Sequence, residues 1–72
     1  MDLILLTRAA QSAFNKAPIF CRDEAYQNAL AIASYLSDPE NFDACRKLYQ
    51  TDDESELARA LAQTLVDAAQ TQ

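Results

Sequence analysis

Apolar residues recur along this chain at the three- and four-residue spacing of α-helices, not at the alternating spacing of half-buried strands. Ser37-Asp38-Pro39-Glu40 is the clearest local signal, because a cap residue, a proline at the first helical position and an acid favour a helix start. The short turn there predicts that the helices on either side pack as an antiparallel hairpin. We therefore expect an all-α fold, a small helical bundle of three to four short helices with a central antiparallel helical hairpin. Its helices should cover about residues 3–16, 24–36 and 39–50 and a last stretch that ends near 69.

Each predicted helix has one apolar stripe that we assign to a shared core. The stripes are, in chain order, Leu6, Ala9, Ala10, Ala13 and Phe14; Tyr26, Ala29, Leu30, Ala33 and Leu36; Phe42, Cys45, Leu48 and Tyr49; and Leu57, Leu61, Leu65 and Ala68. Acids or hydroxyls precede the stripes and are expected to cap the helix starts. The expected capping residues are Asp2, Asp23, Asp38 and either Thr51 or Asp53.

The start of the chain is apolar on every side of its predicted helix. Four consecutive apolar residues point all the way round a helix, and burying all of them takes more than one small core. We predict that these residues form a self-association surface and that the protein is a homodimer, with a short strand or a frayed terminus as the alternative. They are Leu3, Ile4, Leu5 and Leu6.

A second apolar feature lies outside the assigned core stripes. Ile32 and Tyr35 are three residues apart, on one side of the second predicted helix and off its stripe. Tyrosine is enriched among the residues that dominate binding energy at protein interfaces. We predict that Ile32 and Tyr35 bind a protein partner, although a half-buried core position is the simpler interpretation of any single tyrosine.

The composition supports the helical prediction and limits the size of the core. Fourteen of the 72 residues are alanine, none is glycine or tryptophan, and one is valine. Alanine is the strongest helix former, while strands and hairpin turns need residues that are scarce or absent here. The chain is long enough for a single domain, residues 1–72, whose core is thin because alanine buries little area.

The chain is acidic, and its negative charge is concentrated in its last third. Six basic residues against eleven acidic ones give a net charge of −5, which disfavours direct binding to nucleic acid or to anionic membranes. The densest acidic segment contains Asp52, Asp53, Glu54 and Glu56. Its simplest role is to cap a helix start, and its functional role is to dock onto a basic partner. A calcium-binding loop of the EF-hand type needs a glycine that this chain lacks.

The chain lacks the residues on which most catalytic sites depend. Histidine and glycine are both absent, so we predict no enzyme, no cofactor and no metal site. In the predicted hairpin Cys21 and Cys45 should lie about 13 Å apart along the helix axes, which is too far for a disulfide. We therefore expect two buried free thiols. The acid directly after Met1 predicts that the chain has no signal peptide, and the lack of a long apolar run predicts that it has no membrane span. We therefore expect a cytoplasmic protein.

These features together predict a small protein that acts by binding another protein. We expect a non-catalytic adaptor, inhibitor or accessory subunit of a larger protein, of the size and charge that inhibitors encoded by mobile elements often have. One alternative is an acidic nucleic-acid mimic that uses residues 52–56 to block a basic site on its partner. A second is a small helix-turn-helix regulator that binds DNA through the third helix. The residues considered for that role are Asn41, Arg46, Lys47 and Gln50.

Overall fold

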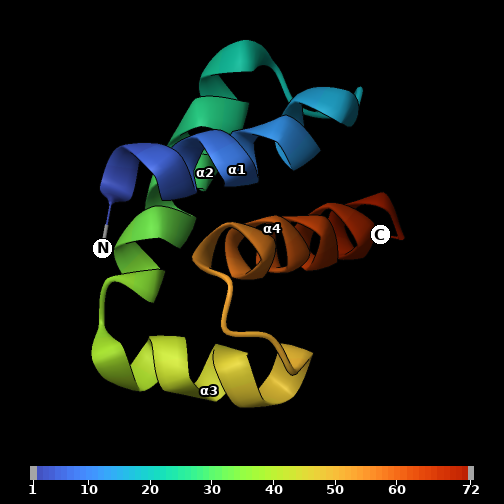
Figure 1. Ribbon diagram of the computed structural model, residues 1–72. Coiled ribbons are helices and arrows are strands. Elements are labelled where there is room, and N and C mark those ends of the chain that lie inside the picture. The colour runs from blue at the N-terminus through green and yellow to red at the C-terminus, as the bar shows by residue number, and fades with distance from the viewer. Residues whose placement is uncertain (1, 72) are drawn as a thin grey trace.

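The computed structural model describes residues 2–71 of the chain, and this part contains four α-helices joined by short connections (Figure 1). They are α1 (Leu3–Lys16), α2 (Arg22–Leu36), α3 (Pro39–Tyr49) and α4 (Glu54–Gln70). The prediction of an all-α bundle is confirmed, and the predicted helix bounds agree with the structure to within about two residues. Met1 and Gln72, the end residues of the predicted domain, lie outside the described residues.

Aspartate side chains satisfy free N–H groups at the starts of α1 and α3, as predicted. Asp2 accepts hydrogen bonds from the backbone N–H of Ile4 at 3.0 Å and of Leu5 at 3.3 Å. Asp38 accepts one from the N–H of Glu40 at 2.9 Å, directly before the proline that begins α3. At both helix starts the residue directly before the helix therefore supplies the cap.

The start of α2 differs from the prediction. Asp23 is not the capping residue, because α2 begins at Arg22 and Cys21 occupies the cap position. Glu24 reaches back from the first turn and accepts a hydrogen bond from the Cys21 N–H at 3.1 Å. That bond to the backbone holds the pKa of Glu24 below its ordinary value of 4.5. The stabilising carboxylate at this helix start thus belongs to a residue of the first helical turn, and not to a residue that precedes the helix.

The central helix of the bundle is α1. It packs along both α2 and α4, whereas α3 is turned across one end of the molecule and makes smaller contacts with α2 and α4 (Figure 1). The structure therefore corrects the expectation of a central antiparallel hairpin between the second and third helices. The physical reason is that α3 has little apolar face to contribute: Cys45 is buried, but Leu48, assigned to the core, is 72% exposed.

Alanine fills the centre of the core. Small side chains let helices approach closely, so larger apolar residues of the same helices are displaced to the flanks. The alanines with no exposed surface are Ala10, Ala25, Ala29, Ala33, Ala58 and Ala62. The predicted stripes of α2 and α4 are rotated as a result: Tyr26, Leu30 and Leu65 are exposed, and Ile32 and Val66 are buried in their place.

A few large side chains complete the core around these alanines. Phe14 is 1% exposed and meets Phe20 edge to face, with ring centroids 5.2 Å apart. Both cysteines are free, and burial raises the pKa of the Cys45 thiol. Cys21 is exposed, so the expectation of two buried thiols is wrong for this residue, which lies in the surface connection before α2.

None of the helices within residues 2–71 is both long enough and apolar enough to cross a bilayer.

Candidate functional site

An apolar groove lies between α2 and α4, and we name it the α2–α4 groove. Its volume is about 290 Å³. One wall comes from the flank of α2 that faces away from α1, and the other comes from the middle of α4. The lining residues are Asn28, Ala31, Ile32 and Tyr35 from α2, with Leu61 and Leu65 from α4.

The two predicted partner-binding residues of α2 both line this groove, but they differ in burial. Tyr35 is 45% exposed, and Leu65 on the opposite wall is 46% exposed, so large half-exposed side chains form the rim. Ile32 is 3% exposed and belongs to the core as well as to the groove wall. The expectation that Ile32 lies off the core is therefore wrong, because the alanine stripe of α2 faces the interior and carries Ile32 inward beside it.

The α2–α4 groove is apolar and has no charged lining residue among those the structure describes. The Asn28 amide and the Tyr35 hydroxyl are the polar side-chain groups in its lining. An apolar surface with a few polar groups at its edge is typical of the centre of a protein interface. The groove can therefore bury an apolar side chain without leaving a charge unpaired.

A second groove lies on the other flank of α2, and we name it the α1–α2 groove. Its volume is about 230 Å³. Three of its apolar side chains, those of Leu3, Ile4 and Tyr26, are close to half exposed or more. The residues that line it are Leu3, Ile4, Thr7, Arg8 and Gln11 from α1, with Tyr26 and Leu30 from α2.

The predicted self-association residues do not form one surface. Leu3 and Ile4 line the α1–α2 groove, and Leu5 is exposed just outside it. Leu6 is 1% exposed, so it is a core residue of the monomer and is not available to a second copy. The reason is its position on the same side of α1 as Ala10 and Ala13, which face the interior.

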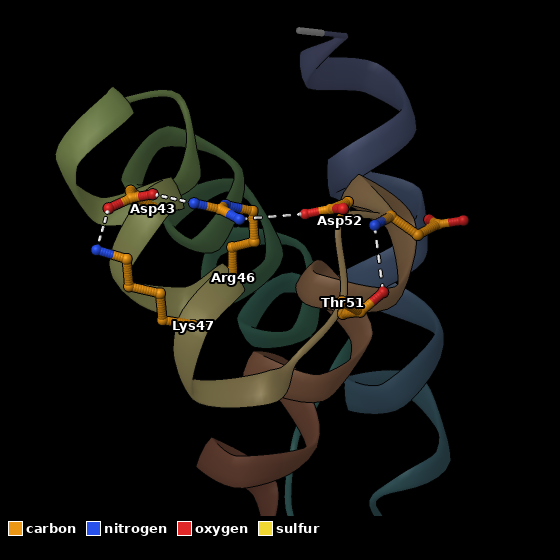
Figure 2. Close-up of polar contacts among 6 residues, drawn as sticks. Asp43, Arg46, Lys47, Thr51 and Asp52 are labelled. Atoms are coloured by element: carbon orange, nitrogen blue, oxygen red, sulfur yellow. Dashed lines mark hydrogen bonds and ion pairs between the residues drawn. The ribbon is translucent and has the colours of Figure 1, made fainter.

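The acidic segment before α4 contacts basic residues of α3 (Figure 2). Asp52 lies 3.6 Å from Arg46, which also binds Asp43 at 2.6 Å, while Lys47 lies 3.0 Å from Asp43. Figure 2 shows Arg46 between the two aspartates, with Lys47 on the far side of Asp43. Hydrogen bonds from Arg46 and then Lys47 hold the pKa of Asp43 below its ordinary value of 3.8.

Two other residues of this segment are engaged in the cap of α4. Asp53 accepts a hydrogen bond from the Glu56 N–H at 3.1 Å. The Thr51 hydroxyl accepts one from the Asp53 N–H at 3.2 Å and donates one to the Glu56 carboxylate at 2.9 Å. The predicted capping role of Asp53 is confirmed, and Thr51 links the two acids. Glu54 lies exposed in the first turn of α4, where its charge favours the helix dipole.

Within residues 2–71, no group of three or more acid or thiol side chains lies close enough together to hold a metal ion. Every buried side-chain nitrogen or oxygen in this range has a hydrogen-bond partner. The described surface thus includes two apolar grooves and an acidic segment in which Asp52, Asp53 and Glu56 have local partners while Glu54 is exposed.

Sequence reasoning missed several groove residues because it placed them in the core. Leu61 and Leu65 fit a helical stripe, and so did Tyr26 and Leu30, yet all four line grooves. One signal is present in the sequence: α2 and α4 each carry an alanine stripe beside the stripe of larger side chains. Where two stripes compete, the smaller residues take the closest helix contacts.

Comparison with protein-family models, with curated proteins and with solved structures finds no match to this chain.

Proposed function

We propose that this protein is a non-catalytic protein-binding module that holds its partner in the α2–α4 groove. It serves as an adaptor, inhibitor or accessory subunit of a larger protein, and it works as a homodimer in the cytoplasm. The occupant of the groove is the apolar face of an amphipathic helix from the partner, which inserts one large apolar side chain.

The observation that carries the proposal is the pair of half-exposed rim residues, Tyr35 and Leu65, on opposite walls of an uncharged groove. Each has apolar surface that the monomer leaves in water, and burial contributes about 25 cal/mol per Å² removed from water. A volume of about 290 Å³ is at the lower end of the range for small-molecule pockets and suits one or two protein side chains. A tyrosine at the rim also fits the composition of binding hot spots.

The net charge of −5 adds a property to the expected partner. An acidic module attracts a basic surface at long range and accelerates its approach. The expected helix therefore carries lysine or arginine beside its apolar face. Two free thiols, one of them exposed, suit a reducing compartment and so support the cytoplasm.

The alternative of an acidic nucleic-acid mimic has weaker support from the side-chain contacts. Asp52 faces Arg46, while Asp53 and Glu56 are held in the cap of α4. The helix-turn-helix alternative is weakened by other contacts, since both basic residues of α3, Arg46 and Lys47, are paired with Asp43.

A comparison of three immobilised baits tests the proposed site. The baits are the wild-type protein, Leu65→Glu and Leu48→Glu, each incubated with an extract of the native host and washed at low and high salt. Leu48 is the matched control, because it is an exposed leucine that lines neither groove. Circular dichroism checks that both variants remain helical.

The expected result is a protein retained by wild type and by Leu48→Glu at both salt concentrations and missing from Leu65→Glu. Equal retention by all three baits contradicts the site. Retention that disappears at high salt for every bait supports the acidic mimic instead.

A further inference from the structure

The α1–α2 groove has an apolar surface and a charged rim that suit a second copy of this chain. Ile4 is 68% exposed, and Leu3, Leu5, Tyr26 and Leu30 around it are also exposed. These residues lie on α1 and one flank of α2, on the opposite side of α2 from the α2–α4 groove. The monomer therefore leaves a second cluster of large apolar side chains in water, separate from the proposed partner site.

Charge at this surface is arranged with opposite signs at two points along α1. Arg8 lines the groove and forms no ion pair with any of residues 2–71. The Asp2 carboxylate accepts from the N–H groups of Ile4 and Leu5, which holds it at the N-terminal end of α1. Asp2 and Arg8 are six residues apart, about 9 Å along the helix axis.

We infer that two copies associate through this face about a two-fold axis, with their α1 helices antiparallel and crossing near Leu5. In that arrangement Asp2 of each copy lies beside the partner's Arg8, and the pair forms twice because a two-fold interface repeats every contact. A parallel arrangement brings Arg8 to Arg8 and Asp2 to Asp2, which like charges oppose. The antiparallel crossing also covers Leu5, which lines neither groove of the monomer.

The size of a typical dimer interface can be compared with the surface of the chain. A stable interface buries about 800 Å² on each partner, roughly a sixth of the 4731 Å² surface of the chain. The five exposed apolar side chains provide its centre, and Thr7, Gln11 and Arg8 provide a polar rim. This inference rests on the proposed homodimer and names its interface, and it leaves the α2–α4 groove free for the partner.

Sedimentation equilibrium of the full chain over a range of concentrations tests this interface. Wild type should dimerise, and Ile4→Ser should raise the dimer dissociation constant at least about tenfold, because each dimer loses two copies of the side chain. Leu48→Ser, the same kind of change outside both grooves, should leave the constant unchanged. A monomeric wild type, or equal constants for Ile4→Ser and Leu48→Ser, overturns the inference.

The antiparallel arrangement has its own test in a pair of charge changes. Arg8→Glu places an acid beside the partner's Asp2 and should weaken the dimer several-fold, more so at low salt. Adding Asp2→Asn, which keeps a good helix cap, should recover part of that loss. No effect of Arg8→Glu, or no recovery, contradicts the antiparallel crossing.

The bait comparison above separates this inference from the proposed function. Ile4→Ser should still retain the proteins that Leu65→Glu loses, so failure of the dimer and failure of the partner site give different results.

Discussion

The α2–α4 groove and the segment from Thr51 to Glu56 are two regions at which a partner can bind, and they differ in what their side chains already contact. In the segment, Asp52 faces Arg46 and the cap of α4 engages Asp53 and Glu56. In the groove, Tyr35 and Leu65 each leave close to half of their surface in water. The difference is that most of the charged side chains of the segment have partners within the fold, whereas the large apolar side chains at the groove rim are left half in water.

The same comparison separates the two kinds of residue that line the groove. Ile32 belongs to the core, and Leu65 belongs to the rim. Mutations in the groove therefore fall into two classes, those that unfold the protein and those that change its surface.

The largest expected effect is on stability, at Ile32. Ile32→Ala removes a buried side chain and should lower the free energy of unfolding by about 3 kcal/mol. That loss is a large fraction of the total free energy of unfolding of a domain this small. Leu65→Ala, which removes a half-exposed side chain from the same groove, should cost less than about 1 kcal/mol. Urea unfolding followed by circular dichroism measures both. Equal losses at the two positions contradict the division of the groove into core wall and rim.

A smaller effect is expected in the acidic segment, at the cap of α4. Asp53→Ala should lower the free energy of unfolding by about 1 kcal/mol, because the Glu56 N–H loses its acceptor. Asp53→Asn should keep most of the stability, since asparagine also caps helices well. If the segment serves a partner and not the fold, Asp53→Ala will leave the urea midpoint of the free protein unchanged.

The smallest expected effect is the dependence of stability on pH. Asp43 and Glu24 have pKa values in the folded protein below their ordinary values of 3.8 and 4.5. A lowered folded pKa favours the charged acid, so the stabilisation is complete above the ordinary value and is lost as the pH falls through the folded one. The urea midpoint should therefore stay level from pH 8 to 5, where the chain has no histidine to titrate, and decline below about pH 4.5.

A variant at Asp43 checks the cause of that decline. Asp43→Asn cannot titrate and should show a shallower loss of stability in acid than the wild type. Identical acid profiles for the two proteins indicate that the contacts with Arg46 and Lys47 do not stabilise the fold.

The helices could be predicted from the sequence because their signals are local. Asp2, Asp38 and Asp53 cap the helices that they precede, and Pro39 begins α3. The prediction failed where the position of a residue depends on neighbouring helices. Helical spacing alone does not decide which side of α4 packs against α1, and in the structure Leu57 and the alanines beside it are buried while Leu65 is exposed.

The candidate site shows the same limit. The prediction that Tyr35 lies off the core stripe of its helix agrees with its exposed fraction of 45%. Leu65 is predicted to lie in the core, since a regular stripe of leucines on a short helix is usually buried, but it is 46% exposed, whereas Leu61 of the same stripe packs against the core. The contact of Asp52 with Arg46 depends on the turn between α3 and α4, where Gln50 adopts a left-handed conformation that sequence patterns do not indicate.

We propose that the apolar α2–α4 groove, and not the acidic segment, binds the partner. The most direct test is the dissociation constant of a captured partner for three proteins: wild type, Leu65→Glu, and a variant that combines Asp52→Asn with Glu54→Gln. We predict that Leu65→Glu raises the constant at least about tenfold, while the neutralised acids change it about twofold or less and an increase in salt from about 0.05 M to 0.5 M raises it by a smaller factor than Leu65→Glu does. A constant that rises steeply with salt and with loss of the acids, but not with Leu65→Glu, would contradict the account.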